Sequence, residues 1–211
     1  MIVAIAVIGG LAEAAAWTLV SWGRVRVWTS LAVVLAACGV AALATGRIAL
    51  SPRVSPALAA AVGAGLGLAL FGATRAFVGL VSGVWQAFRR DVPAIYREQR
   101  GLSLRAAMVA ALAVGVGEEL FWRGLVQGRI AAGPGRVAGY ALAWLAYVGA
   151  NLPGRNLAIV AGAVVGGAVW GGLALWTGGV LGCAVCHAVW TELMIAFPPS
   201  VARPLGSATP A

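Results

Sequence analysis

Long apolar runs separated by short polar segments make up most of the chain. A transmembrane helix needs about 20 consecutive apolar residues, and several of these runs approach or reach that length. The first run opens the sequence without a preceding basic segment, so we interpret it as a spanning helix rather than a cleaved signal peptide. The third run can be extended past Arg75. The predicted spans are residues 2–22, 27–46, 56–74, 103–128, 137–151, 156–176 and 178–197.

Two polar segments stand outside these runs. Residues 84–100, VWQAFRRDVPAIYREQR, combine mixed charge with a proline and with Trp85 and Tyr96, which suit the level of lipid headgroups. We predict an interfacial helix or loop there. Residues 198–211 are rich in proline and carry one charge, which predicts a disordered tail. The chain is therefore expected to form a single transmembrane domain over residues 1–197, followed by this tail.

The composition supports lipid as the solvent. The chain is 62% hydrophobic and 10% charged, whereas soluble domains carry about 25% charged residues. In lipid, the backbone satisfies its own hydrogen bonds only in helices or closed barrels, and barrel strands alternate in polarity at every second residue. We therefore predict an all-α, polytopic integral membrane helical bundle with about seven transmembrane helices, within a range of six to eight. The location that we expect for it is the inner membrane of a bacterial cell.

The positive charge of the chain is consistent with this topology. All 15 basic residues are arginine, and the net charge is +9. Most of them lie between apolar runs, where charge sets membrane orientation. No basic stripe with interleaved aromatic residues lies outside the runs, so we expect membrane lipid as a partner and no nucleic acid. Seven spans would put ten loop arginines on one side and four on the other, which predicts an outer N-terminus and an inner C-terminus.

The segment GEELFWRG places charge inside the fourth run. A charge at the bilayer centre costs about 2.5–3.5 kcal/mol on insertion scales. Arg123 follows Glu119 by four positions, so the two side chains share a helical face and can pair. Glu118 is rotated by about 100° from Glu119 and is left as a candidate general base. Taken alone, these residues fit a structural ion pair equally well.

His187 is the only histidine, and it lies within an apolar run. A lone histidine there serves either as a hydrogen-bonded packing residue or as a functional group. Residues 183–187, CAVCH, match the C-x-x-C-H pattern of covalent haem attachment, but their place inside a hydrophobic span argues against it. A zinc site is disfavoured because Cys183 and His187 share a face while Cys186 points elsewhere. We expect no cofactor and no metal.

These residues together resemble the CAAX-protease and bacteriocin-processing (CPBP, or Abi) family of intramembrane proteases. The family's first motif, E-E-x-x-x-R, corresponds to Glu118-Glu119-Leu120-Phe121-Trp122-Arg123, and the flanking GEELFWRGLVQG is close to the family's usual wording. Its last motif has a histidine followed by small and aromatic residues, as in TGGVLGCAVCHAVWT around His187. The resemblance covers about residues 103–194 and is specific at the first motif.

The sequence departs from the family pattern at two positions. The middle motif, Phe-x-x-x-His, has its best match in Tyr147-Val148-Gly149-Ala150-Asn151, with asparagine in place of the histidine. The last motif's asparagine is replaced by Thr191. The resemblance implies that Glu118 activates water, that His187 stabilises the oxyanion, and that Glu119 and Arg123 support them. Asn151 can form hydrogen bonds but cannot accept a proton, and Thr191 offers one donor where an asparagine amide has two.

The resemblance implies an intramembrane endopeptidase that acts on membrane-associated peptides or proteins in a water-filled cavity. Because the chain has only one histidine, a two-histidine metal site is not available, and we predict a metal-independent glutamate-type protease. Two alternatives stay open. One is a catalytically degenerate relative that binds a membrane partner in an immunity or regulatory role. The other is a small transporter, which is disfavoured because the two halves show no inverted repeat.

Overall fold

The computed structural model describes residues 1–97, 102–130 and 133–202, and these ranges contain helices and turns without any strand. The predicted all-α fold is confirmed. The element η2 is a π-helix, and η3 and η4 are single 3-10 turns. In chain order the elements are α1 (Ile2–Ser21), α2 (Val27–Ala44), α3 (Pro56–Val84), α4 (Gln86–Arg97), α5 (Leu104–Glu118), η2 (Glu119–Gln127), α6 (Gly128–Ile130), α7 (Arg136–Asn151), η3 (Leu152–Gly154), α8 (Leu157–Thr177), α9 (Leu181–Ala196) and η4 (Ser200–Ala202).

Short polar residues and a glycine set several of the helix ends. Ser55 and Ser103 precede α3 and α5, and the side chain of each accepts a hydrogen bond from a backbone N–H in the first turn. Asn156 does the same at α8, where it accepts two such bonds at 3.0 Å. These caps satisfy N–H groups that have no partner within the helix. Gly178 then ends α8 in the left-handed conformation, with φ of 74°.

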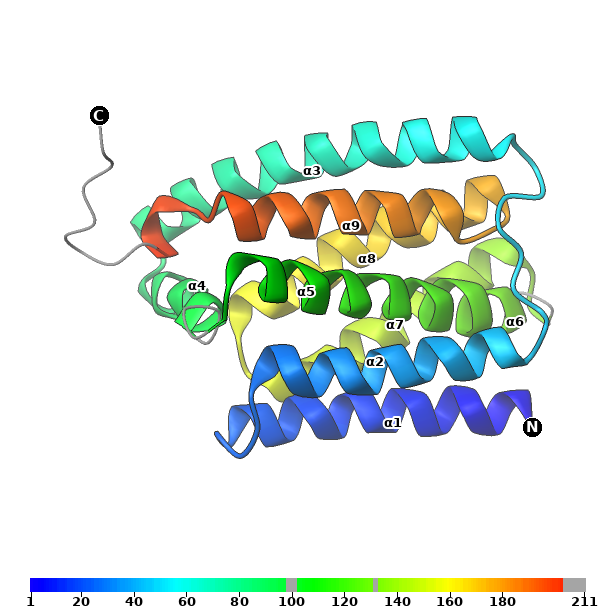
Figure 1. The fold of residues 1–211 in the computed structure, drawn as a ribbon, viewed down its shortest axis with the longest axis horizontal. Coiled ribbons are helices and arrows are strands. Elements are labelled where there is room, and N and C mark those ends of the chain that lie inside the picture. The colour runs from blue at the N-terminus through cyan, green and yellow to red at the C-terminus, as the bar shows by residue number, and fades with distance from the viewer. Residues whose placement is uncertain (98–101, 131–132, 203–211) are drawn as a thin grey trace.

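The long helices run side by side along one axis of the molecule, and α4 lies at one end (Figure 1). The N-terminus and the C-terminal end of α9 lie at opposite ends of this bundle. Within it, α3 packs against α9, α2 against α5, and α7 against α8. Large apolar side chains such as Val7, Ile8 and Leu11 of α1 face outward and are exposed. In water such an apolar exterior would be costly, whereas it suits lipid.

Four helices are long and apolar enough to cross a membrane, namely α1, α2, α3 and α8. The apolar helix α9 is shorter, with 16 residues. Three further elements, α5, η2 and α6, form one uninterrupted helical run over residues 104–130. The protein is therefore a polytopic membrane bundle, and seven crossings remain the predicted count. The helix α3 continues to Val84, beyond the predicted end at residue 74.

The predicted regular helix over residues 103–128 changes its hydrogen-bond pattern part-way. From Glu119 to Gln127 the backbone is a π-helix, in which each N–H bonds to the carbonyl five residues earlier. The wider turn matches the burial of this segment, because seven of its nine residues are buried on several sides of the helix. π-Helical turns occur frequently at functional sites, and this one begins at the second glutamate of GEELFWRG.

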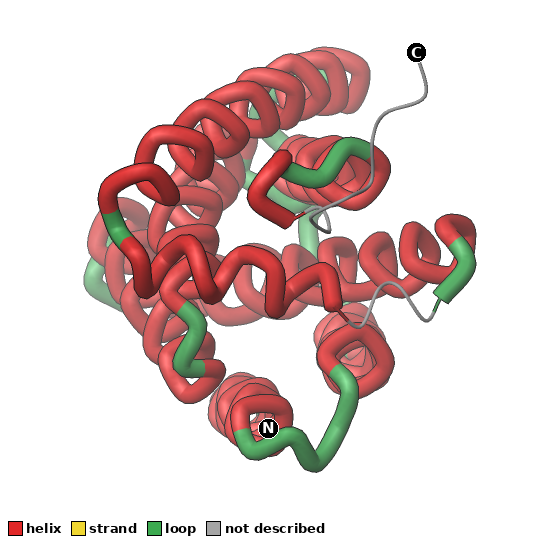
Figure 2. Tube along the Cα trace, turned by 90° about the vertical axis from the view of Figure 1, so that its left-hand side faces the viewer, coloured by secondary structure: helices red, strands yellow, loops and turns green. Residues whose placement is uncertain are grey.

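One end of the bundle is closed by α4, which runs across the ends of the long helices (Figure 2). Its apolar face, Phe88, Val92 and Tyr96, packs against Val78 of α3 and Ala202 of η4. The predicted polar segment 84–100 is thus an amphipathic helix in its described part, and residues 98–100 lie outside the described residues. At the start of the predicted disordered tail, Ser200–Ala202 form the 3-10 turn η4, and Ala202 is buried against α4. Residues 203–211 lie outside the described residues.

At both ends of the bundle, arginine side chains donate hydrogen bonds to backbone carbonyls at the C-terminal ends of helices. Arg75 Nη1 donates to the carbonyl of Phe197 at 2.5 Å, just beyond α9. At the opposite end, Arg53 and Arg136 both donate to the carbonyl of Leu175 near the end of α8. Carbonyls at a helix C-terminus have no partner within the helix and carry partial negative charge. These arginines therefore stabilise helix ends in addition to contributing to orientation.

The close packing of α5 against α2 positions the start of η2. A Cβ atom at Gly117 would lie 2.4 Å from the backbone oxygen of Leu35, and one at Gly39 would lie 2.9 Å from the Cα atom of Gly117. Only glycine allows the two backbones to approach this closely. The residue after Gly117 is Glu118, so this contact fixes where the first glutamate enters the interior.

Candidate active site

The helical run from α5 into η2 carries three charged side chains into the interior of the bundle. Glu118, Glu119 and Arg123 are all buried, with Glu119 fully so. Arg123 Nη1 donates to Glu119 Oε1 at 3.1 Å, which is the pairing predicted from their spacing. The guanidinium of Arg123 also lies 4.3 Å from the ring centroid of Tyr147, and its Nη2 donates to the carbonyl of Gly167 at 3.5 Å. Contacts from η2, α7 and α8 therefore hold the cation.

His187 of α9 lies against both glutamates. Its Nδ1 is 2.9 Å from Glu119 Oε1 and 3.9 Å from Glu118 Oε2. The imidazole stacks on the indole of Trp170, with ring centroids 3.7 Å apart and planes inclined by 11°. These contacts fix the plane of the ring and occupy Nδ1. Nε2 is then the ring nitrogen available to a ligand.

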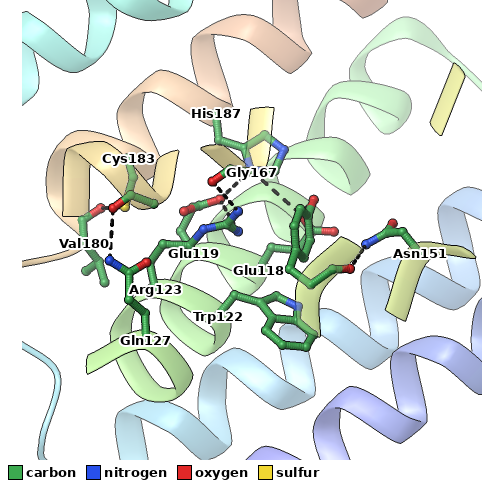
Figure 3. Close-up of polar contacts among 12 residues, drawn as sticks. Glu118, Glu119, Trp122, Arg123, Gln127, Asn151, Gly167, Val180, Cys183 and His187 are labelled. Carbon is green, nitrogen blue, oxygen red and sulfur yellow. Dashed lines mark hydrogen bonds and ion pairs between the residues drawn. The ribbon is translucent and has the colours of Figure 1, made fainter. Parts of the chain in front are cut away.

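The helix α7 supplies the other side of the site. The Tyr147 hydroxyl donates to Glu118 Oε2 at 2.9 Å. One turn later, Asn151 Nδ2 donates to the backbone carbonyl of Tyr147 at 3.0 Å and to Oε1 of Glu13 at 3.1 Å. Figure 3 shows Asn151 approaching the glutamates from the side opposite Cys183. The site residues form two hydrogen-bonded groups: Glu119 with Arg123 and His187, and Glu118 with Tyr147 and Asn151. The contact of 3.9 Å between His187 Nδ1 and Glu118 Oε2 joins the two groups into one network, whereas a water-filled cavity around them stays a prediction.

Comparison with protein families gives one match that includes most of this network. Residues 100–192 match the family described as type II CAAX prenyl endopeptidase Rce1-like. This part of the chain belongs to the CAAX-protease family. The match includes Glu118, Glu119, Arg123, Asn151 and His187. No curated protein and no solved structure matches the chain.

The CAAX-protease family consists of intramembrane endopeptidases, and its match spans α5 to α9. Within this segment the two departures from the family pattern have different surroundings. Asn151 is fully engaged in the network through its Nδ2. Thr191 lies one turn after His187 in α9, and its buried hydroxyl has no hydrogen-bond partner among the described residues. Thr191 therefore offers a free hydroxyl on the same face of α9 as His187.

A further residue joins the network from outside the family segment. Glu13 of α1 is fully buried, and its Oε2 accepts a hydrogen bond from Trp122 Nε1 at 2.6 Å while its Oε1 accepts the bond from Asn151. Its role is not predicted from the sequence. One signal was present, because Glu13 is the only charged residue of α1, and ionisable residues within a membrane span are candidates for function by default.

The network also contains three groups that could ligate a metal ion. Glu118, Glu119 and His187 each offer one ligand atom, and these atoms lie within 4.8 Å of one another. However, Glu119 Oε1 is 3.1 Å from the guanidinium of Arg123, and a neighbouring positive charge opposes binding of a cation. Cys183 and Cys186 are buried, and the Cys183 thiol donates to the carbonyl of Val180 at 3.1 Å.

Proposed function

We propose that this protein is an intramembrane endopeptidase that hydrolyses membrane-associated or lipidated peptides, with Glu118 as the base that activates water. The proposal includes the inner membrane of a bacterial cell as its location. The observation that supports it best is the division between the two glutamates. Glu119 is paired with Arg123 and His187, whereas Glu118 is held by the Tyr147 hydroxyl and keeps capacity to accept a proton.

The chemistry follows from these roles. Glu118 accepts one proton of a water molecule, and the electron pair of the broken O–H bond forms a bond to the scissile carbonyl carbon. The π electrons of the carbonyl move to its oxygen, which becomes an oxyanion. When the carbonyl re-forms, the C–N bond breaks, and Glu118 returns its proton to the leaving nitrogen. A single carboxylate thus serves as base and then as acid.

Two donors are available for the oxyanion. When His187 is protonated on both nitrogens, Nδ1–H is held by Glu119 and Nε2–H can donate to the oxyanion. The free hydroxyl of Thr191 can supply a second hydrogen bond. None of these steps uses a metal ion, and we propose metal-independent hydrolysis.

A catalytically degenerate member that binds a membrane partner is the second candidate. It is favoured by Asn151, which cannot accept a proton in place of the family's histidine. Losing a general base typically costs a factor of about 10²–10⁴ in rate. A binding or immunity function would need the scaffold but not the reaction.

Cleavage of a membrane-peptide library by the purified protein in lipid nanodiscs tests the proposal. We expect Glu118→Gln, which keeps the size of the side chain, to lower the cleavage rate by about 10²–10⁴. The matched control is Glu192→Gln in α9, because the Glu192 carboxylate has no hydrogen bond to the network. We expect this control and a metal chelator to leave the rate unchanged. Cleavage that persists at the wild-type rate in Glu118→Gln would exclude the proposed mechanism.

A further inference from the structure

We propose that Glu13 is a positioning residue for the reaction, since it sets the orientation of the Asn151 carboxamide. This inference rests on the proposed function, because it assigns Asn151 a role toward the water that Glu118 activates. Glu13 lies 138 residues before Asn151 in the chain and outside the segment that matches the family. The packing of α1 against α7 brings the two side chains together.

Both oxygens of Glu13 are occupied by nitrogen donors. Trp122 Nε1 donates to Oε2 at 2.6 Å, and Asn151 Nδ2 donates to Oε1 at 3.1 Å. Indole nitrogen is a donor only. Trp122 therefore holds the Glu13 carboxyl group in place, and Glu13 Oε1 accepts a hydrogen bond from Asn151.

The hydrogen-bond donors of Asn151 then determine whether the nitrogen or the oxygen of its side-chain amide is free. Its Nδ2 has two hydrogens, and these are used by Glu13 Oε1 and by the backbone carbonyl of Tyr147 at 3.0 Å. Turning the amide over would place Oδ1 against these two acceptors and lose both bonds. Both hydrogen bonds of the carboxamide are thus made by Nδ2, and Oδ1 remains. Asn151 consequently presents an acceptor to the site and not a donor.

An acceptor in this place suits the attacking water. Tyr147 links Asn151 to Glu118, since its backbone carbonyl accepts from Asn151 and its hydroxyl donates to Glu118. A water that gives one proton to Glu118 can donate its second proton as a hydrogen bond to Asn151 Oδ1. That proton stays on the oxygen that attacks. Asn151 thus orients the water without accepting its proton, and Glu118 is the only base.

Because the chain has few asparagines, the orientation of the Asn151 amide can be tested directly, without an activity assay. The sequence has two asparagines, Asn151 and Asn156, so protein labelled with ¹⁵N-asparagine gives two side-chain amide signals. Asn156 Nδ2 makes one hydrogen bond, to the carbonyl of Asp91, and serves as the internal reference. We expect both Asn151 protons to exchange with solvent more slowly than the free proton of Asn156. Equal exchange in the wild-type protein would overturn the inference without any variant.

Glu13→Gln extends the test. Its amide can donate to Asn151 Oδ1, so the carboxamide can turn over. We expect the Asn151 signal to shift while that of Asn156 stays, and kcat to fall about 10- to 100-fold with KM unchanged, against an unchanged Glu192→Gln control. An unshifted Asn151 signal, or an unchanged kcat, overturns the positioning role.

If Glu118→Gln abolishes cleavage while Glu13→Gln does not, the proposed function stands and only this inference fails. If Glu118→Gln cleaves at the wild-type rate, the proposed function fails, and the Asn151 signals still decide the orientation set by Glu13.

Discussion

At the scale of single residues, one oxygen atom holds much of the network together. Glu119 Oε1 lies 3.1 Å from Arg123 Nη1 and 2.9 Å from His187 Nδ1. Glu119 has no exposed surface, and Arg123 has almost none. In such surroundings an unpaired charge is very costly. We therefore expect Glu119 to contribute mainly to stability, whereas Glu118, which has a neutral hydroxyl donor, is the base in the proposed reaction.

This division predicts different costs for removing the two glutamates. Glu119→Ala leaves Arg123 buried without its carboxylate partner, and we expect a loss of about 3–5 kcal/mol of stability. Glu118→Ala removes the partner of the Tyr147 hydroxyl, and the loss of one such bond costs about 1–3 kcal/mol. Thermal unfolding of both variants in detergent measures the difference. Two variants of equal stability would show that the glutamates share the structural role.

Asn151→His restores the side chain that the family pattern has at this position. One ring nitrogen can donate to Glu13 as Asn151 Nδ2 does, and the other can then accept a proton near neutral pH. We expect the cleavage rate to rise, by up to a factor of about 10²–10⁴. The gain should disappear in combination with Glu118→Ala, because both groups act on the same water. An inert Asn151→His variant together with an unaltered Glu118→Ala variant would favour the binding function.

At the scale of helices, the sequence predicts what depends on local composition. The apolar runs gave α1, α2, α7, α8 and α9 to within a few residues, because a long apolar run in lipid must form a helix. The π-helix and the role of Glu13 were not predicted. Both depend on neighbours distant in the chain: η2 is buried on several sides at once, and Glu13 acquires its meaning from Trp122 and Asn151. The spacing of residues along the sequence does not specify contacts between segments that are far apart in the chain.

The contact between α2 and α5 gives a prediction at this scale. Gly117→Ala would place a methyl group 2.4 Å from the backbone oxygen of Leu35, so the helices must separate. Overpacking of this kind costs about 1–3 kcal/mol, and it displaces Glu118 next to it. We expect lower thermal stability and lower activity.

Gly65→Ala in α3 is the matched control, because nothing lies within 4 Å of a Cβ atom there. Alanine is favoured over glycine in helices, so this variant should be at least as stable as the wild-type protein. A Gly117→Ala variant that behaves like Gly65→Ala would show that the helices can separate without cost.

At the scale of the whole molecule, the two ends of the bundle differ in arginine content. One end contains the α1–α2 turn, α4, the start of α5 and the α7–α8 turn, and the other contains the α2–α3 loop and the segments joining η2 to α7 (Figure 1). The described arginines at the first end include Arg24, Arg26, Arg89, Arg90, Arg97, Arg105 and Arg155, and those at the second end include Arg47, Arg53, Arg129 and Arg136. This asymmetry supports the predicted orientation, with the first end facing the cytoplasm.

Cysteine labelling tests that orientation. The three native cysteines are buried, so a membrane-impermeant maleimide should react only with an introduced thiol. Applied from outside intact spheroplasts, it should label Arg47→Cys and not Arg24→Cys until the membrane is opened. The opposite pattern would reverse the orientation. Labelling of both variants from outside would contradict a crossing between these two positions.

The long chain separation between Glu13 and its partners has a consequence for how the protein is made. Ribosomes add about 5–20 residues per second, so about 7 to 28 seconds pass between synthesis of Glu13 and synthesis of Asn151, 138 residues later. The donor nearer in the chain, Trp122, is still 109 residues away. Until Trp122 has been synthesised, α1 lies in the bilayer with a carboxyl group that has neither donor. The apolar remainder of α1 must therefore offset an insertion penalty of about 2.5–3.5 kcal/mol, and every further polar substitution in this helix should reduce the fraction of chains that insert correctly.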